Sequence, residues 1–194
     1  MINLLLKIFT ENPYSFHYLR KIPEFNYNQT KKRIKRLTPR KDVPILDIGC
    51  GTGEYCRLFS STHYIGIDVS DSYIRFAKKH YPEYEFRRQD GKALKFQDKR
   101  FDYVLINAVI HHATDIDARA ILLEASRVLS PKGIAILIDG VPTLVTNILD
   151  RGGYLRKERK NYSLVKQVFK IIKREKFRSG VCDNILFVLK HRIP

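Results

Sequence analysis

The chain has 194 residues, of which 44% are hydrophobic, and a formal net charge of +16. This length predicts one packed domain, and because no run of eighteen apolar residues occurs we expect no transmembrane helix. Met1–Phe9 has too short an apolar core and no basic leader for a signal peptide. Cys50, Cys56 and Cys182 form no C-x-x-C pair and are odd in number. They therefore argue against a disulfide framework or a metal site, and favour a reducing cytoplasm.

The positive charge is concentrated at the two ends of the chain. Residues 1–41 hold ten Lys/Arg against two Asp/Glu, residues 42–150 hold thirteen against fifteen, and residues 151–194 hold thirteen against three. The densest cluster is Lys31–Arg36. Such ends would attract an anionic partner, and a phospholipid surface, a phosphorylated sugar or RNA all fit. The solvated face of a lysine-rich protein explains the same charges equally well.

The first 41 residues are predicted to form a helical leader. Apolar residues repeat at helical spacing over Leu4–Phe9, and Pro13 is expected to break that run. A second helix is predicted over Asn28–Leu37. Interleaved aromatic residues either line a substrate pocket or, more simply, pack the leader onto the rest of the chain: Tyr14, Phe16, Tyr18, Phe25 and Tyr27.

The most informative stretch is a buried strand, Val43–Ile48, followed by a glycine-rich turn and a short helix expected to start near Glu54. Glycines at every second position of residues 49–53 let the backbone adopt positive φ and press against a nucleoside-like ligand. Asp47 is expected to place a carboxylate beside this turn. A dinucleotide fingerprint requires G-x-G-x-x-G, whereas this chain has acid-x-G-x-G-x-G, which suits a cationic ligand better than a pyrophosphate.

Leu46–Gly53 resembles the first motif of the class I S-adenosylmethionine-dependent methyltransferases. The resemblance covers roughly residues 43–190 and implies a Rossmann-like, doubly wound α/β fold, with a mostly parallel seven-stranded sheet and an antiparallel C-terminal hairpin strand. It divides the chain into the basic helical leader of residues 1–41, packed on the domain, and a methyltransferase domain of residues 42–194. The implied cofactor is S-adenosyl-L-methionine, and no metal is needed because the leaving group is neutral.

The second strand is predicted over His63–Val69 and ends in an acid, Asp68, about twenty residues after the first glycine. A carboxylate at this strand tip can accept hydrogen bonds from both hydroxyls of a ribose. An acid at a strand end is also a common helix cap, and Ser70 or Asp71 are equally suited to cap the next helix, predicted over Asp71–His80. The spacing to the glycine turn favours the ribose role.

The third strand is predicted over Tyr84–Asp90. In the family that the chain resembles, an acidic residue here meets the adenine amino group, although an Asp-Gly pair also forms a turn by itself. The fourth strand is predicted over Phe101–Asn107. The cofactor-binding residues implied by the resemblance are Asp47, Gly49, Cys50, Gly51, Gly53, Asp68, Val69, Asp90, Gly91 and Asn107.

The loop Ala108–Asp115 follows the fourth strand and lies where ligands bind a parallel sheet, beyond the carboxyl ends of the strands. It resembles the hydrophobic-x-His-His-x-x-Asp signature of the type 11 group, whose acceptors are mostly small molecules, lipids or sugars. His111 and His112 are candidate general bases because imidazole titrates near neutral pH, although such histidines also serve as packing or capping residues. The Asn/Asp-Pro-Pro-aromatic segment of methyltransferases that act on nucleic-acid bases is missing.

A helix is predicted over Ile116–Leu129, followed by a turn at Ser130–Gly133 and a fifth strand over Ile134–Asp139. In the resembling family a residue at this strand tip lies in the acceptor pocket. Asp139 is therefore a second candidate, for orienting a histidine or the substrate.

The C-terminal part is predicted to hold a helix around Tyr162–Val168 and two strands, Phe169–Arg178 and Asn184–Lys190, joined as a hairpin. An Asp-Arg-Gly segment at residue 150 and the Arg-Ser-Gly-x-Cys-Asp hairpin resemble a type 11 subgroup of unstated substrates. If the sixth strand is parallel to the first five, three arginines either clamp an anionic substrate group or are surface charges: Arg151, Arg156 and Arg178.

We therefore expect methyl transfer from S-adenosylmethionine to a small-molecule, lipid or sugar-type acceptor, possibly anionic, with His111, His112 or Asp139 taking the proton. One alternative is an RNA-directed methyltransferase or RNA-associated protein whose basic ends grip phosphates, although no fused RNA-binding module is found. A second is a cofactor-binding protein without catalysis, or a peripheral membrane partner held by its first nine residues.

Overall fold

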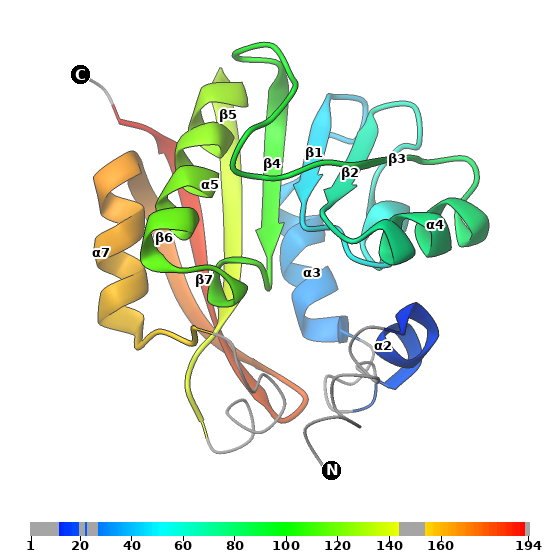
Figure 1. The fold of residues 1–194 in the computed structure, drawn as a ribbon. Helices are drawn as coiled ribbons and strands as arrows, with labels where there is room; N and C mark the ends of the chain where they lie inside the picture. Colours follow the sequence, from blue (N-terminus) through cyan, green and yellow to red (C-terminus); the bar gives the residue numbers. More distant parts are fainter. Residues whose placement is uncertain (1–11, 20–21, 23–26, 144–153, 193–194) are drawn as a thin grey trace.

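The computed structural model describes residues 12–19, 22, 27–143 and 154–192 (Figure 1). Within these residues one sheet has the strand order β3-β2-β1-β4-β5-β7-β6. The first five strands are parallel, β7 is antiparallel to β5, and β6 is antiparallel to β7. The predicted mostly parallel sheet with a C-terminal hairpin is confirmed. The strands are β1 (Ile45–Ile48), β2 (Tyr64–Asp68), β3 (Glu85–Arg88), β4 (Phe101–Asn107), β5 (Leu129–Gly140), β6 (Phe169–Ser179) and β7 (Cys182–His191).

Helices cover both faces of this sheet. α5 (Asp115–Val128) and α7 (Glu158–Val168) pack on one face, and α3 (Asn28–Leu37), α4 (Asp71–His80) and the 3-10 turn η2 (Cys56–Leu58) pack on the other. Successive side chains of each central strand point to opposite faces, so both layers receive apolar residues from the same strands. The predicted bounds of α3, α4 and β4 are confirmed. None of the described helices is both long enough and apolar enough to cross a bilayer.

The helix expected near Glu54 is absent from the described structure, where only the three-residue η2 follows the glycine turn. Gly53 has a φ of 82°, which no right-handed helix can include. After it the backbone closes only short turns, with the Cys56 N–H donating to the Gly53 carbonyl at 3.2 Å and the Leu58 N–H to the Tyr55 carbonyl at 3.0 Å. The prediction of a helix that starts near Glu54 was wrong, because the residues after Gly53 close successive short turns in place of a regular helix.

Pro13 is the first residue of a helix, and the break that it was expected to make in the run before it stays a prediction. α2 (Pro13–Leu19) starts at this residue, and the Asn12 side chain accepts hydrogen bonds from the N–H groups of Tyr14 and Ser15. A proline suits the first turn because its missing N–H would have no helical partner there. The helix expected over Leu4–Phe9 lies outside the described residues.

The strand β5 begins at Leu129, so the turn predicted at Ser130–Gly133 is part of the strand. The pairing with β4 shifts register there, between the pairs Phe101–Leu129 and Tyr103–Ile134. A Cβ on Gly133 would lie 2.9 Å from the Asp102 carbonyl oxygen, so the two backbones approach closely. Despite the shift, the carboxyl ends of β4 and β5 lie side by side.

The helix α3 contacts the edge strand β6. Arg33 and Arg36 both form ion pairs with Glu175, at 2.8 and 3.1 Å, and the Arg33 guanidinium lies 4.1 Å from the centre of the Phe177 ring. Hydrogen bonds from Lys173 and Arg33 lower the pKa of Glu175 to about 2. Two of the five cations in the basic cluster predicted to attract an anion are thus paired with β6. The domain boundary at residue 41 stays a prediction.

A buried arginine ties the segment before α7 to the loop that carries the two histidines. Arg156 is 3% exposed and donates hydrogen bonds to the carbonyls of Ile110 and Ala113, both at 2.6 Å, and to that of Tyr154 at 3.2 Å. Its Nε also donates to Asp115 Oδ1 at 2.8 Å. The interpretation of Arg156 as a substrate clamp was wrong, because its guanidinium is committed to this loop.

The Asp47 carboxylate is buried in the layer between the sheet and α3. It is 1% exposed and accepts a hydrogen bond from the Tyr64 hydroxyl at 2.7 Å. Burial raises its pKa to about 7, although the Tyr64 hydrogen bond opposes the rise. At mildly acidic pH the Asp47 carboxyl is therefore protonated in the folded protein and ionised in the unfolded chain.

Replacing Arg156 by Ala is expected to lower the free energy of unfolding by about 2–4 kcal/mol, because three carbonyls and the Asp115 carboxylate lose a buried partner. Urea denaturation measures the loss. The control is Arg159→Ala, whose side chain is exposed and which should stay within about 0.5 kcal/mol of wild type. Equal losses in the two variants would contradict this account of the loop.

The Asp47 shift predicts a pH dependence of stability. Because the folded pKa of about 7 exceeds the ordinary value of 3.8, the folded state binds more protons between these limits, and stability falls as pH rises through that window. Above pH 7 the contribution is constant. Urea denaturation from pH 4 to 8 should show the stability of wild type relative to Asp47→Asn decreasing toward pH 7. A difference independent of pH would show that Asp47 is ionised throughout.

Candidate active site

Three glycines turn the chain at the carboxyl end of β1. Gly49, Gly51 and Gly53 have φ values of 70°, 53° and 82°, in the region that favours glycine. The N–H groups of Gly49 and of the next residue both donate to the Ile67 carbonyl, at 2.8 and 2.9 Å, which joins the turn to β2. A Cβ on Gly49 would lie 2.3 Å from Val109 Cγ2, so the loop after β4 packs directly against the turn.

The Asp68 carboxylate at the tip of β2 holds the same turn. Its Oδ2 accepts the Gly51 N–H at 2.9 Å and its Oδ1 accepts the Ser70 N–H at 2.8 Å. Burial raises the pKa of Asp68, although these two N–H groups oppose the rise. The helix cap is supplied by Ser70, whose hydroxyl accepts the Tyr73 N–H at 3.3 Å. The Val69 N–H is a third donor to this carboxylate, and the Val69 side chain is exposed.

Two of the residues expected to bind the cofactor point into the core. The Asp47 carboxylate is buried against Tyr64, and the Cys50 thiol is also buried, which raises its pKa well above the usual range. Both side chains belong to the layer that contains α3 and α4. Both side chains therefore face the core in this structure, and their role in cofactor binding stays a prediction.

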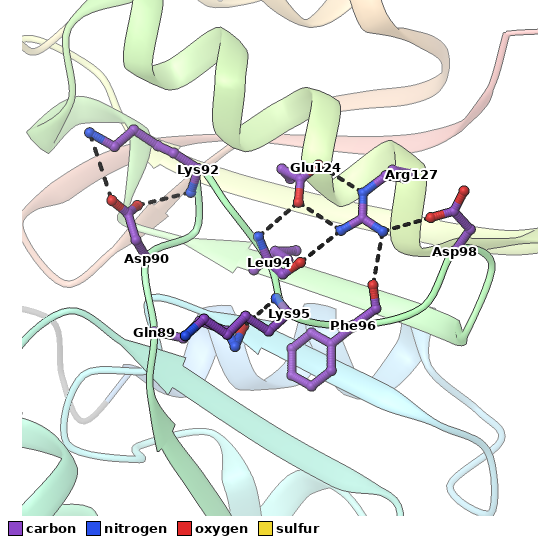
Figure 2. Close-up of polar contacts among 9 residues, drawn as sticks. All are labelled: Gln89, Asp90, Lys92, Leu94, Lys95, Phe96, Asp98, Glu124 and Arg127. Atoms are coloured by element: carbon purple, nitrogen blue, oxygen red, sulfur yellow. Dashed lines mark hydrogen bonds and ion pairs between the residues drawn. The ribbon is translucent and has the colours of Figure 1, made fainter.

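The Asp90–Gly91 tip after β3 lies against the end of β1. A Cβ on Gly91 would be 2.9 Å from Ile48 Cγ2, so only glycine allows this approach. The exposed Asp90 carboxylate accepts the Lys92 N–H at 2.9 Å, and Figure 2 shows it turned toward that residue. The tip is placed near the Asp68 edge of the sheet, as the predicted order of acids requires.

The loop that follows Asp90 is held to α5 by an arginine–glutamate pair (Figure 2). Arg127 donates to the carbonyls of Phe96 and Leu94, at 2.8 and 2.9 Å, and pairs with Asp98 at 2.6 Å. Glu124 accepts the Leu94 N–H at 2.7 Å, and the pKa of this carboxyl is lowered mainly by Arg127. These contacts fix the loop between β3 and β4, and hence the position of the Asp90–Gly91 tip.

Contacts that the motifs did not indicate complete this edge of the site. Asn107, at the end of β4, donates to the Tyr55 hydroxyl at 3.1 Å. From the leader, His17 Nδ1 lies 2.9 Å from the Thr52 hydroxyl, and Lys31 forms an ion pair with Glu54. Motif spacing did not indicate that Tyr55 or His17 lies at the site, because neither residue belongs to a motif. The described part of the leader lies beside the glycine turn.

The two histidines lie in η3 (Ile110–His112), directly beyond β4. His111 Nδ1 is 2.6 Å from Asp139 Oδ1 at the end of β5, and both side chains are at most 1% exposed. Since an ionised carboxylate only accepts, this contact is one in which Nδ1 donates to Asp139. His112 is exposed and its ring centre lies 4.1 Å from that of His111. The structure therefore brings His111 and Asp139 together and leaves His112 at the surface.

Three arginines were considered either as an anion clamp or as surface charges, and the two that the structure describes do not converge. Arg178 pairs with Asp183 across the β6–β7 hairpin at 2.8 Å, and this hydrogen bond lowers the pKa of the Asp183 carboxyl. The Arg156 guanidinium is hydrogen-bonded to the histidine loop. Arg151 lies outside the described residues. The hairpin does lie at the same edge of the sheet as the glycine turn, because β6 is parallel to the first five strands.

Residues 45–133 match the family described as methyltransferase domain. The ubiquinone biosynthesis O-methyltransferase of Pelagibacter ubique is 32% identical over 133 residues, which cover 63% of this chain and 51% of that protein. A probable tRNA methyltransferase 9B of Mus musculus is 34% identical over 90 residues, 46% of this chain and 20% of that protein.

Among solved structures, the magnesium protoporphyrin IX methyltransferase of Synechocystis with bound S-adenosylhomocysteine superposes with a TM-score of 0.72 at 17% identity, over 89% of this chain and 87% of that one. This likeness supports the fold. The chain spans about half the length of the ubiquinone relative that it matches. With the glycine turn, the strand-tip acids and the sheet order, these matches show that the chain carries a class I S-adenosylmethionine-dependent methyltransferase domain.

Proposed function

We propose that the chain transfers a methyl group from S-adenosylmethionine to an oxygen atom of a small-molecule or lipid-like acceptor. The observation that carries the proposal is the buried His111–Asp139 pair, 2.6 Å apart, at the same edge of the sheet as the glycine turn and Asp68. A hydroxyl must lose its proton when it is methylated, and an imidazole oriented by a carboxylate is suited to accept it.

The residues at the tips of β1, β2 and β3 fit the cofactor chemically. The Asp68 carboxylate, at the tip of β2, is an acceptor suited to the vicinal hydroxyls of a ribose. The exposed Val69 offers an apolar surface to the adenine plane, and the Asp90 carboxylate can accept from its amino group. The glycine turn leaves room for the methionine end. S-adenosylmethionine supplies an already activated sulfonium methyl, so the protein's task is to align the acceptor with it.

The proton is proposed to pass to His111 Nε2. Asp139 holds the imidazole through Nδ1, and Arg156 fixes the carbonyls on both sides of the histidine pair. Because His111 is 1% exposed, an acceptor reaches it only after displacing the residues that cover it. Exclusion of water from this position strengthens the His111–Asp139 hydrogen bond.

The acceptor class rests on the relatives and on the loop chemistry. The Pelagibacter relative is named as an O-methyltransferase of ubiquinone biosynthesis, and an oxygen acceptor agrees with a His–Asp pair. An RNA acceptor is the second candidate, favoured by the similarity to a probable tRNA methyltransferase and by the basic ends of the chain. Cofactor binding without catalysis is the third, and it predicts uptake of the donor with no transfer to any acceptor.

Replacing Asp68 by Ala is expected to lower the affinity for S-adenosylhomocysteine at least about a hundredfold, because two hydroxyls lose a charged acceptor. Calorimetric titration measures this loss, and thermal unfolding checks that the turn survives. Asp71→Ala removes a nearby exposed carboxylate and should leave the affinity unchanged. Wild-type protein that takes up neither the donor nor its demethylated product would overturn the proposed function.

Replacing His111 by Ala is expected to lower kcat by about 10²–10⁴ while leaving the affinity for S-adenosylhomocysteine unchanged. The assay follows tritiated methyl transfer from S-adenosylmethionine to extracted lipids, phenolic compounds, sugars and bulk tRNA in parallel. Asp139→Asn should reduce kcat less, since the imidazole is kept. If His112→Ala carries the loss and His111→Ala does not, the assignment of the base is wrong.

A further inference from the structure

The first turn of α5 and the start of α7 frame a hollow of about 660 Å³. The Tyr154 N–H donates to the His111 carbonyl at 2.5 Å, so this hollow lies next to the proposed base. A second hollow, of about 490 Å³, lies between α7 and β6 and shares Arg159 with the first. The two hollows therefore lie on either side of Arg159.

This surface carries excess positive charge. Six cationic side chains and two carboxylates line the two hollows, which leaves four positive charges unbalanced. Lys157 and Arg159 are exposed and form no ion pair within the described part of the chain. Asp115 is shared by Arg156 and Lys160, and Lys160 is the first cause of the lowered pKa of this carboxyl. The charge therefore exceeds what the chain's own acids can neutralise.

Large apolar side chains are exposed at the same place. Ile116, on the first turn of α5, is 82% exposed, and Tyr154, in the wall of the first hollow, is 52% exposed. Figure 1 shows the first turn of α5 next to the start of α7, and the ion pairs of Asp115 with Arg156 and Lys160 join the two.

We propose that this docking patch, formed by Ile116, Tyr154, Lys157, Arg159 and Lys160, binds the surface of an anionic phospholipid bilayer. The cations attract lipid phosphates, and the isoleucine and tyrosine enter the boundary between headgroups and acyl chains. RNA phosphates would engage the same cations, and bases would stack on the tyrosine, but neither contact gives a reason for an isoleucine that is 82% exposed.

The docking patch explains how a lipid-like acceptor reaches His111. A bilayer on this face brings acceptors dissolved in it to the hollow beside η3 without passage through water. This part of the inference rests on the proposed function, whereas bilayer binding itself does not, because it requires neither the methyl donor nor an acceptor. The two can therefore fail separately.

The test is sedimentation of the full chain with vesicles of phosphatidylglycerol and phosphatidylcholine in equal amounts. Binding is expected at physiological salt, with loss in pure phosphatidylcholine and weakening as salt rises. Lys157→Glu with Arg159→Glu should reduce partitioning about tenfold or more, and Ile116→Glu by a similar factor. Acids suit the first turn of α7, so the double variant should fold, and circular dichroism and S-adenosylhomocysteine titration check this.

Two matched controls lie elsewhere on the surface. Lys79→Glu with Lys132→Glu reverses two exposed charges on α4 and at the start of β5, and Leu123→Glu changes a half-exposed apolar residue two turns along α5. Both should keep wild-type partitioning. The inference is overturned if wild type ignores anionic vesicles, or if controls and patch variants lose binding equally. It is also overturned if bulk tRNA, and no vesicle, is bound through Lys157 and Arg159 without an effect of Ile116→Glu.

Discussion

The site depends on the way in which the tip of β2 holds the glycine turn of β1. The Ile67 carbonyl accepts two consecutive N–H groups of the turn, and the Asp68 carboxylate accepts a third, from Gly51. These bonds use the donors that positive-φ glycines expose, and they fix the turn without any side chain of its own. Because the turn carries no side chain at Gly49, the loop after β4 can pack against it through Val109. One set of hydrogen bonds thereby places the residues proposed to bind the cofactor next to the histidine loop.

The loop that carries the histidines is held in place by buried polar and charged side chains. His111, Asp139 and Arg156 are nearly inaccessible, and burying them is costly unless each group is hydrogen-bonded. Arg156 meets this condition through three carbonyls and Asp115, and it draws the segment before α7 over the loop of η3. The histidine loop is therefore held from two sides, by the end of β5 and by the segment before α7. Such a loop keeps an imidazole oriented, which a surface loop would not do.

Charge along the chain is used in two ways. In the leader, Lys31, Arg33 and Arg36 are paired with Glu54 and Glu175, so the densest basic cluster of the sequence holds α3 against the glycine turn and β6. Near α7 the acids are too few to pair all the cations, and Lys157 and Arg159 remain exposed. Local density of Lys and Arg was therefore a poor guide to which cations are available to a partner, because availability depends on the acids that the fold brings beside them.

The arrangement of the sheet followed from the family resemblance. The sequence by itself determined the strand that carries the glycine turn, the helices α3 and α4, and the order of the acids at the strand tips. These features are local: periodicity, glycine spacing and caps act within a few residues. It also named His111 and His112 as candidate bases and Asp139 as a residue that orients a histidine or the substrate, without deciding which histidine. The contact of His111 with Asp139 across 28 residues, the burial of Asp47 against Tyr64, and the commitment of Arg156 to the histidine loop came only from the tertiary structure. Neighbouring parallel strands bring distant residues together, and whether a charged side chain faces a ligand or the core depends on packing that no short stretch of sequence contains.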